Sequence, residues 1–380
     1  MSIQKIVVII PTYNESLVIE QTVHEVFAAL SNRVAVQAHI LIFDSCSTDN
    51  TQDIVRALQA TYPHLHLQSE PEKTGLGSAY AQAMHYALTQ LDADIVVEFD
   101  ADLSHQPCYL FPMIEQMHHH DVVVGSRYIK GGSIPHNWGW HRKLLSILGN
   151  YVARFILTPK YKDFTSGFRV THHSVLRKAL PKQFISKNYA YKLELLWRLH
   201  QEKAKIMEYP IEFIDREKGE SKLPANSILD SLRVLVVLRY RKLKSYLSMC
   251  MVGLVGLLVQ CLVYNVLRVK FAPFFCAQLA VSAAMANNFV LNNQITFKKR
   301  NLNKQFKSVF VFVAYSLLMI GLQSYWARLG TYYFGLGYLK ENIIIACGVV
   351  FGSLLNYLFY SKVVWREKNE PSFSRTRESI

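Results

Sequence analysis

The 380-residue sequence is poor in cysteine, and its six cysteines show neither a CxxC spacing nor a paired framework. A disulfide-stabilised secreted fold is therefore excluded, and free thiols in a reducing compartment are expected. The N-terminus also lacks the pattern of a cleavable signal peptide, because it opens directly into the apolar run Lys5–Ile10. We therefore expect the first two-thirds of the chain to stay in the cytoplasm.

Acidic residues are scarce in the last part of the chain. Residues 233–380 hold 19 lysines and arginines against 4 aspartates and glutamates, whereas residues 1–232 hold 23 against 24. A basic excess can indicate nucleic-acid binding, but here it lies beside long apolar runs and not across a soluble domain. Attraction to anionic lipid headgroups explains it better, so a membrane is expected as a partner and nucleic acid is not.

Four apolar segments each approach the ~20 residues that a bilayer span needs. They are Leu247–Leu267, Phe274–Ile295, Val309–Ala327 and Ile343–Val364. Basic residues cluster before the first segment, between the second and third, and after the last, so the positive-inside rule places both termini in the cytoplasm. The membrane would be the plasma or inner membrane in a prokaryote. The spans lack acidic residues and histidine, which favours an anchoring role over transport.

Apolar runs alternate with helical stretches near the N-terminus. The predicted strands are Ile6–Ile10, Ala38–Phe43, His64–Gln68, Ile95–Phe99 and Val122–Gly125, and the predicted helices are Ser16–Leu30, Thr51–Tyr62 and Gly77–Leu91. This alternation is typical of an α/β fold with a mostly parallel sheet and helices on both faces. Because ligands of such sheets bind at the carboxyl ends of the strands, the residues that follow each strand are the candidates for chemistry.

Two later stretches combine basic residues with an apolar face. Asn226–Tyr246 runs straight into the first apolar span, which favours a helix in the headgroup plane over an ordinary surface helix. For Trp138–Leu157 the sequence favours neither an interfacial helix nor one that faces a core.

The most informative motif is an acidic pair, Asp100-Ala101-Asp102, directly after the predicted strand Ile95–Phe99. Carboxylates two residues apart in a loop can converge on one hard divalent cation, Mg²⁺ or Mn²⁺, and such a cation usually also holds substrate phosphates. A phosphate-handling site on a membrane-tethered protein is the simplest interpretation.

Polar segments also follow the other predicted strands, and none of them is decisive alone. Asp44 and Asp49 frame a turn that could bind a nucleoside hydroxyl or could simply build the turn and cap a helix. The loops Thr165–Arg169 and Arg216–Leu223 place cations on hydroxyl-rich segments that suit phosphate, although solvated surface loops have the same composition.

Taken in order, six motifs resemble the family 2 glycosyltransferases of the dolichol-phosphate mannose synthase type, which have a GT-A fold. The motifs are Pro11-Thr12-Tyr13-Asn14-Glu15, the turn from Asp44 to Asp49, Asp100-Ala101-Asp102, Gly125-Ser126-Arg127-Tyr128, the segment Asp163–Arg169, and Gly219-Glu220-Ser221-Lys222-Leu223. The membrane part looks like the GtrA-like four-helix domain that some polyprenyl-phosphate mannose synthases carry. Its Asn288-Phe289-Val290-Leu291 and Thr296-Phe297 motifs carry this second resemblance.

The resemblance implies four parts. These are a cytoplasmic GT-A domain over residues 1–223, a basic juxtamembrane helix over 224–246, a transmembrane domain over 247–366 and a cytoplasmic tail over 367–380. The family's reaction transfers a hexose, with inversion, from a nucleotide diphosphate sugar to a polyprenyl or dolichyl monophosphate at the cytoplasmic face. GDP-mannose is the expected donor. UDP-glucose or another UDP-sugar stays open, as does a carrier or assembly scaffold that only senses nucleotide sugars.

The resemblance also assigns roles to individual residues. Donor binding falls to Pro11, Tyr13, Glu15, Asp44, Asp100, Ala101, Asp102, Arg127, Arg216 and Lys222. Among these, Asp100, Asp102 and Arg127 are the expected catalytic residues, and both aspartates are expected metal ligands. Acceptor binding falls to Arg142, Ser146, Ser166 and Arg169.

Two positions depart from the family's pattern. Ser45 stands where many relatives have a second aspartate in the nucleoside turn. Ser104 stands where some mannose synthases have a glutamine that ligates the metal. Because a serine hydroxyl is a shorter and poorer ligand, Ser104 is a weaker candidate ligand than the two aspartates, and water could take its place.

Overall fold

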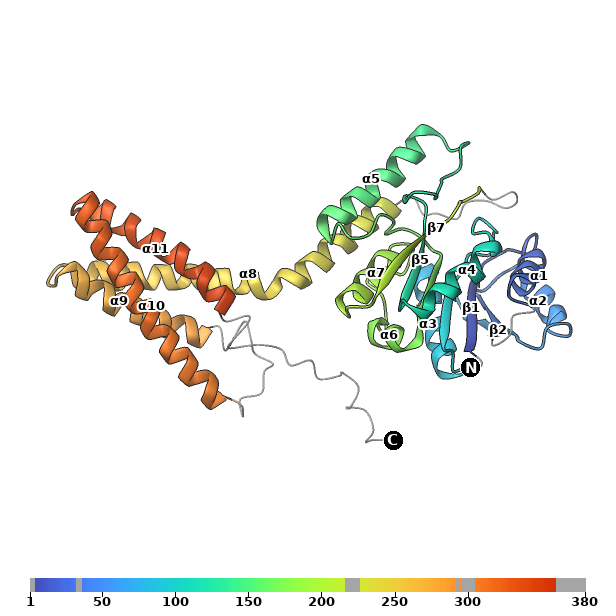
Figure 1. The fold of residues 1–380 in the computed structure, drawn as a ribbon, viewed down its shortest axis with the longest axis horizontal. Coiled ribbons are helices and arrows are strands. Elements are labelled where there is room, and N and C mark those ends of the chain that lie inside the picture. The colour runs from blue at the N-terminus through green and yellow to red at the C-terminus, as the bar shows by residue number, and fades with distance from the viewer. Residues whose placement is uncertain (1–3, 32–35, 216–225, 292–293, 295–304, 360–380) are drawn as a thin grey trace. The chain divides into compact units, whose positions relative to one another are not determined.

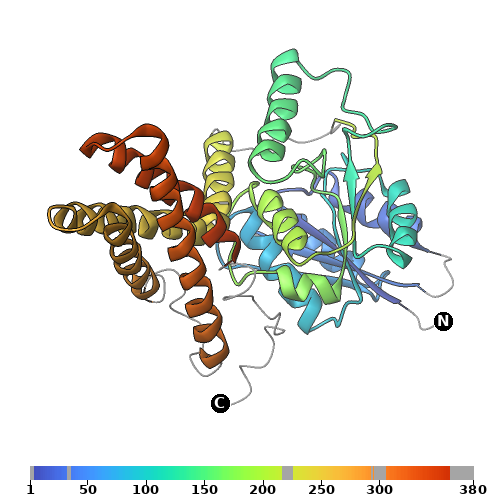
Figure 2. The same cartoon turned by 60° about the vertical axis from the view of Figure 1, so that its left-hand side comes forward.

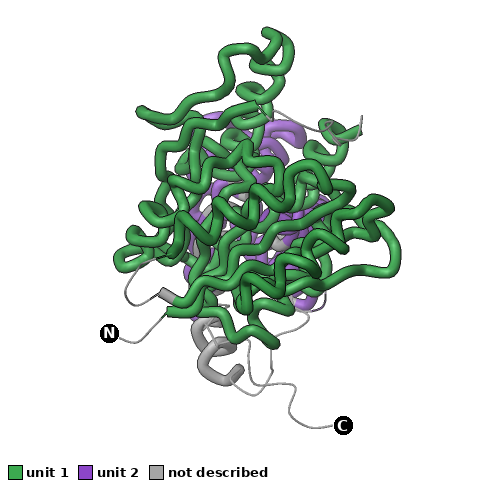
Figure 3. The backbone as a smooth tube through the Cα atoms, turned by 90° about the vertical axis from the view of Figure 1, so that its right-hand side faces the viewer, with its two compact units in different colours: residues 1–239 green, residues 240–380 purple. Residues whose placement is uncertain are grey.

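The computed structural model describes residues 4–31, 36–215, 226–291, 294 and 305–359. The chain divides into two compact units, residues 1–239 and residues 240–380 (Figure 3). The first unit holds a seven-stranded sheet, and the described part of the second unit is helical.

The sheet of the first unit is mixed but mostly parallel (Figure 1). Its strands are β1 (Gln4–Thr12), β2 (Val36–Asp44), β3 (Leu65–Ser69), β4 (Ile95–Glu98), β5 (Val122–Ser126), β6 (Arg169–His172) and β7 (Ile206–Pro210). They lie in the order β3-β2-β1-β4-β6-β5-β7, and only β6 runs antiparallel to its neighbours, β4 and β5. The predicted α/β fold is therefore confirmed.

Helices cover both faces of this sheet because its central strands are apolar on both sides (Figures 1 and 2). In β1, Val7 and Ile9 face one core, while Ile6, Val8 and Ile10 face the other. The first core contains α3 (Leu76–Thr89), α5 (Trp140–Ile156), α6 (His173–Ala179) and α7 (Tyr191–Gln201), and the second contains α1 (Ile19–Leu30), α2 (Thr51–Leu58) and α4 (Leu110–Glu115). Short 3₁₀ turns at Pro107–Tyr109 and Gln116–His118 flank α4.

Helix α8 (Ser227–Arg268) supplies side chains to the core of the first unit. Val234, Leu235 and Leu238 are buried among the residues of the α3 and α7 face. Other apolar side chains of the same turns, such as Leu229 and Val236, are exposed. The first turns of α8 therefore present two apolar faces, of which one packs within the first unit.

The second unit contains the rest of α8 together with α9 (Pro273–Leu291), α10 (Gln305–Phe334) and α11 (Tyr338–Phe359). Its buried cluster gathers small and aromatic side chains, including Tyr264, Ala280 and Ala327. Among the described residues, the segment Cys250–Arg268 has the length and apolar composition to cross a bilayer. The prediction of four spans remains a prediction.

Helix α11 begins before the predicted fourth span and so includes Glu341, an acidic residue that the span predicted from sequence left out. Its carboxylate is buried and accepts hydrogen bonds from the Tyr264 hydroxyl at 2.6 Å and from Arg268 Nε at 3.0 Å. An acidic side chain is thus present at the start of this helix, and it is paired.

Candidate active site

The loops that follow β1 and β2 are joined by hydrogen bonds at the carboxyl end of the sheet. The Asn14 amide donates to Ser47 Oγ at 2.9 Å, and the Thr48 amide donates to Asn14 Oδ1 at 2.8 Å. Asn14 has φ 54°, a left-handed conformation that asparagine tolerates because its side chain can bond locally. The two segments predicted to bind a nucleoside therefore form one surface.

Asp44 organises the turn after β2. Its carboxylate is fully buried and accepts hydrogen bonds from Thr12 Oγ1 at 2.9 Å and from Gln52 Nε2 at 2.6 Å. The amide of Ser47 and its hydroxyl also donate to Asp44, at 2.9 and 2.5 Å. These four donors show Asp44 as a turn-building residue, and a contact with a nucleoside remains a prediction.

Asp49 fixes the other end of the same turn. It accepts hydrogen bonds from the Ser16 amide at 3.1 Å, the Thr51 amide at 3.0 Å and the Thr51 hydroxyl at 2.5 Å. Desolvation raises the pKa of Asp49, but the hydrogen bonds from Thr51 and Ser16 outweigh it and lower this pKa to about 2. Asp49 is therefore ionised at neutral pH and holds the loops after β1 and β2 together.

Tyr13 lies beneath a lysine that the sequence analysis did not single out. The Lys73 ammonium is 3.2 Å from the centroid of the Tyr13 ring, a cation–π contact. Two glycines follow Lys73, and at the second the Gly77 amide donates to the Lys187 carbonyl at 2.7 Å. A Cβ on Gly77 would lie 2.7 Å from the Ser186 carbonyl oxygen. The glycine spacing before α3 thus allows this loop to approach the Ser186–Asn188 segment.

The acidic pair follows β4, as predicted. Thr22 Oγ1 on α1 donates to the Ala101 carbonyl at 2.7 Å and so fixes the backbone between the two aspartates. Asp102 Oδ1 accepts the Ser104 amide at 3.1 Å and the Ser104 hydroxyl at 2.6 Å. In this geometry Ser104 orients the Asp102 carboxylate as a hydrogen-bond donor.

Asp100 Oδ2 faces two nitrogen atoms. Lys192 Nζ lies 4.0 Å away and His105 Nδ1 lies 3.5 Å away. Burial lowers the pKa of His105, and this effect outweighs the attraction of Asp100, so the ring is neutral at pH 7. Within the described residues, no three His, Cys, Asp or Glu side chains gather into a metal-binding group. The carboxylate oxygens of Asp100 and Asp102 are of the type that Mg²⁺ or Mn²⁺ prefers, so these two residues remain the candidates to hold a divalent cation.

A buried ion pair lies beneath the acidic pair. Glu98 on β4 faces Arg169 on β6, with 2.9 Å between Oε2 and Nε, and both side chains are at most 2% exposed. The Tyr191 hydroxyl donates to Glu98 Oε1 at 3.0 Å. Burial raises the pKa of Glu98, and Arg169 only partly opposes the shift. Arg169 was predicted to bind the acceptor, but its burial places it under the site, where it supports β4.

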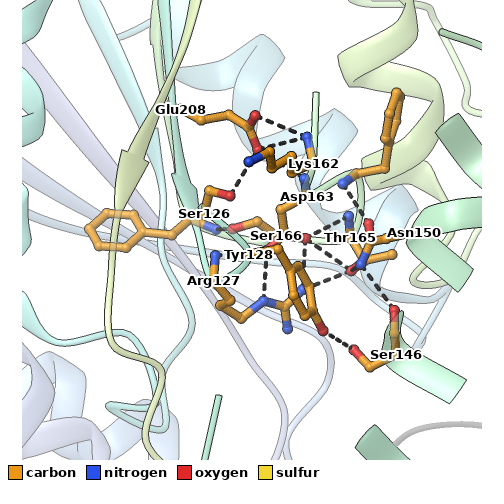
Figure 4. A network of polar contacts seen from close by, with 12 residues as sticks. Ser126, Arg127, Tyr128, Ser146, Asn150, Lys162, Asp163, Thr165, Ser166 and Glu208 are labelled. Carbon is orange, nitrogen blue, oxygen red and sulfur yellow. Dashed lines mark hydrogen bonds and ion pairs between the residues drawn. The ribbon is translucent and has the colours of Figure 1, made fainter. Parts of the chain in front are cut away.

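Arg127 at the end of β5 is held by Asp163 (Figure 4). Its Nε and Nη2 each lie 2.8 Å from an Asp163 oxygen, and Nη2 also donates to Thr165 Oγ1 at 2.7 Å. Burial opposes the charge on Arg127, but Asp163 outweighs it and raises the Arg127 pKa, while Arg127 lowers that of Asp163. This bidentate pair fixes the guanidinium and neutralises its charge.

Helix α5 is attached to the same network (Figure 4). Tyr128 Oη lies 2.6 Å from Ser146 Oγ, and Asn150 Nδ2 donates to Thr165 Oγ1 at 3.2 Å. Ser166 Oγ accepts the Phe168 amide at 3.2 Å and is buried. Two of the predicted acceptor residues, Ser146 and Ser166, therefore have internal partners.

Arg142, by contrast, stays half-exposed at the start of α5. Its guanidinium lies 3.9 Å from the centroid of the Trp138 ring and 3.5 Å from Asp215 Oδ1. Of the four predicted acceptor residues, it is the charged one with surface left for a ligand.

Comparison with known proteins agrees with this geometry. Residues 7–180 match the family model described as glycosyl transferase family 2, and residues 249–365 match the model described as GtrA/DPMS, transmembrane domain. The chain is 30% identical over 375 residues to the dolichol-phosphate mannosyltransferase of Pyrococcus furiosus, and the match covers 95% of this chain and 99% of that one. It belongs to the family 2 glycosyltransferases. Its second unit is a membrane domain of the GtrA/DPMS type.

Two other relatives of this glycosyltransferase match a shorter part of it. The polyprenol monophosphomannose synthase of Mycolicibacterium smegmatis is 34% identical over 231 residues, which are 60% of this chain and 84% of the relative. The undecaprenyl-phosphate mannosyltransferase of Micrococcus luteus is 33% identical over 219 residues, which are 58% of this chain and 87% of the relative.

The glycosyltransferase thus brings the predicted strand-end residues to one edge of its sheet. Pro11, Tyr13 and Glu15 follow or end β1, Asp44 ends β2, and the acidic pair follows β4. Arg216 and Lys222 lie outside the described residues. The sequence analysis did not single out Lys73 or Lys192. Two nearby glycines, Gly75 and Gly77, could have drawn attention to Lys73. Lys192, in the first turn of a helix, looks in the sequence like an ordinary surface residue.

Proposed function

We propose that this glycosyltransferase transfers mannose from GDP-mannose to a polyprenyl or dolichyl monophosphate at the cytoplasmic face of a membrane, with inversion. The single observation that supports it most is the match to the Pyrococcus furiosus dolichol-phosphate mannosyltransferase, which extends over both units of this chain. The names of the other two relatives point to the same acceptor class and the same sugar.

The chemistry asks for charge stabilisation and not for a general base. The acceptor phosphate is already anionic at neutral pH, so its oxygen can attack the anomeric carbon without losing a proton. The bond from that carbon to the nucleoside diphosphate oxygen breaks, and the leaving diphosphate carries away the electron pair. Groups that stabilise the growing charge on the diphosphate therefore decide the rate.

In this mechanism Asp100 and Asp102 would hold the divalent cation. Mg²⁺ or Mn²⁺ would supply Lewis-acid stabilisation of the leaving group. Ser104 and the Ala101 backbone hold the carboxylates at the end of β4. Tyr13 and the turn around Asp44 would face the nucleoside, and Arg216 and Lys222 would neutralise phosphates.

The acceptor must reach the site from a bilayer, and the first unit offers a surface for this. Helix α5 exposes an apolar stripe in which Phe155 is 91% and Trp140 is 77% accessible. The first turns of α8 add Leu229 and Val236. Exposed apolar side chains at helical spacing beside basic residues support an interfacial role for both helices over a core-facing one. Arg142, at the start of α5, would meet the lipid phosphate.

The topology forms part of the proposal. The membrane domain would cross the bilayer four times with both termini in the cytoplasm, as the distribution of basic residues predicts. Substituted-cysteine labelling from either side of sealed vesicles, in a background without the native cysteines, would test it. A cysteine introduced in the link between the second and third apolar segments should react only from the cytoplasmic side.

The function can be tested with membranes that contain the full chain, a polyprenyl phosphate and one labelled nucleotide sugar at a time. GDP-mannose should label an organic-extractable, acid-labile lipid, and UDP-glucose should not. Labelling from UDP-glucose alone would replace mannose by glucose in the proposal. The absence of a labelled lipid with every donor, together with intact nucleotide binding, would favour the sensing scaffold.

A further inference from the structure

Lys192 is a buried lysine at an unusual place. It lies in the first turn of α7, where the helix dipole disfavours a cation, and its side chain is 10% exposed. Its ammonium lies 4.0 Å from Asp100 Oδ2, on the acidic pair. A lysine in such a position needs a negative partner to offset the costs of burial and of the helix dipole.

The neighbouring loop leaves space for this lysine. A Cβ on Gly167 would lie 2.3 Å from Lys192 Nζ and 3.3 Å from Asp100 Oδ2. Gly167 belongs to the Asp163–Arg169 motif, and its φ is not in the left-handed region that would require glycine. A side chain at residue 167 would therefore have to displace the Lys192 ammonium from its position beside Asp100.

Two other buried charges near the site have partners of opposite charge. Glu98 is paired with Arg169, and Arg127 is paired with Asp163. Each pair sums to zero formal charge, whereas Lys192 adds one positive charge to the two carboxylates at the end of β4. A divalent cation at these carboxylates would then make the cluster net positive, which suits a diphosphate anion better than a neutral cluster does.

We propose that Lys192 is a fixed cation of the donor site. It contacts the nucleoside diphosphate alongside the divalent cation and holds Asp100 in place. The proposal rests on the proposed function, because it assigns Lys192 to the leaving group of that reaction. It predicts that the enzyme retains part of its nucleotide affinity without metal and binds the metal more weakly than two aspartates alone would.

The test uses the full-length protein in detergent and two binding measurements. GDP affinity in the presence of a chelator is measured by calorimetry, and Mn²⁺ affinity without nucleotide is measured by electron paramagnetic resonance. Lys192→Met keeps the unbranched apolar part of the side chain and removes its charge. We expect it to weaken metal-free GDP binding about 10-fold and to tighten Mn²⁺ binding by a similar factor, since the same positive charge attracts the diphosphate and repels Mn²⁺.

Opposite shifts separate the proposal from a structural role. If both affinities fall, or if neither changes, Lys192 is not a donor-site cation. Lys182→Met, at an exposed position in the connection before α7, is the matched control and should change neither value. Lys192→Arg should restore metal-free GDP binding, at least in part.

A second variant covers the case in which Lys192→Met fails to fold. Gly167→Ala keeps the lysine but places a Cβ where its ammonium lies, so the ammonium must shift from its position beside Asp100. It should reproduce the two opposite shifts, and wild-type values in a folded Gly167→Ala protein would overturn the proposal. Lipid labelling by the wild type is measured in parallel: an inactive wild type with these shifts contradicts the proposed reaction, whereas an active wild type without them contradicts only the role of Lys192.

Discussion

The two units of the chain use buried polar side chains for different purposes. In the first unit, Glu98 and Arg169 pair across adjacent strands, directly beneath the loop that carries the acidic pair. In the membrane unit, polar side chains pair between helices, as Asn265 Nδ2 does with Asn342 Oδ1 at 3.1 Å and Arg268 Nε with Glu341 at 3.0 Å.

The difference reflects where each pair lies. In the first unit, burial makes the charges rigid, so the pair fixes β4 against β6 below the acidic pair. In the membrane unit, Glu341 and Asn342 precede the predicted fourth span, so the pairs mainly join helix ends to one another. We therefore expect that changes in the first unit alter chemistry and that equivalent changes in the second alter assembly.

The largest effect is expected at the acidic pair. Asp102→Asn removes the charge of a proposed metal ligand but keeps the hydrogen bonds with Ser104, so transfer should fall by about 10²–10³-fold in a folded, membrane-bound protein. Labelled-lipid formation measures the loss. Asp53→Asn, at an exposed site on α2, is the control and should retain wild-type turnover. Near-normal transfer by Asp102→Asn would end the assignment of this site as the catalytic one.

The next prediction compares one ion pair from each unit, which is fully buried in the first unit and partly exposed in the second. Arg169→Met leaves Glu98 as an unpaired buried charge and should lower the local opening free energy around β4 and β6 by about 3 kcal/mol. Glu341→Gln should cost the membrane unit only about 1 kcal/mol, as polar contacts between membrane helices usually do.

Hydrogen exchange followed by mass spectrometry resolves the two units in the same sample. The double variant Glu98→Gln with Arg169→Met is the control, because it removes both charges and should recover part of the lost protection. If Arg169→Met and Glu341→Gln lowered the opening free energy of their units equally, the ion pairs of the two units would not differ in their contribution to stability.

A smaller effect is expected where the first unit meets lipid. Arg142→Ala should raise the apparent KM for the polyprenyl phosphate about 10-fold and leave GDP-mannose affinity unchanged, because the exposed guanidinium would contact only the acceptor. Steady-state kinetics with each substrate varied in turn separates the two constants. Arg56→Ala, on the surface of α2, is the control. A loss of donor affinity with normal acceptor dependence would move Arg142 into the donor pocket.

The smallest effect on chemistry is expected from removal of the membrane unit. A chain that ends at Lys244 keeps Val234, Leu235 and Leu238 in the core of the first unit and should still transfer sugar to a short-chain acceptor in detergent. The assay compares the transfer rates of the truncated and the full chain, and a separate measurement checks that both bind GDP with equal affinity. Complete loss of transfer with intact GDP binding would mean that the membrane helices help to build the acceptor site.

The sequence predicted the part of the fold in which local pattern and tertiary structure agree. Strands β1 to β5 are apolar runs, and each ends in a polar loop, so their positions and the site-bearing loops were accessible. Strand β6 was missed because it begins with Arg169, and an arginine does not indicate a buried strand. It is buried here because Glu98 on β4 lies opposite and pairs with it.

The candidate donor site was likewise predictable only where its residues are neighbours in the sequence. The acidic pair could be predicted because its two carboxylates are neighbours in the sequence. Lys192, which faces them, could not be predicted because it lies far along the chain. It is recognised only from its contact with Asp100 and its close approach to Gly167 in the folded protein. Likewise, the sequence could not show that donors from β1, from the turn and from α2 occupy the Asp44 carboxylate, whose contact with a nucleoside stays a prediction.

Helix α8 has a consequence for how this protein can be recombined with its relatives. Its first turns fill the core of the catalytic unit, and the same uninterrupted helix continues as the apolar segment Cys250–Arg268. A chimaera joined at Ser227 would import foreign side chains into a close-packed interior, whereas a junction after Leu238 would exchange only the anchor. Any exchange of anchors between such enzymes is therefore constrained to leave α8 up to Leu238 with the catalytic unit whose core it fills.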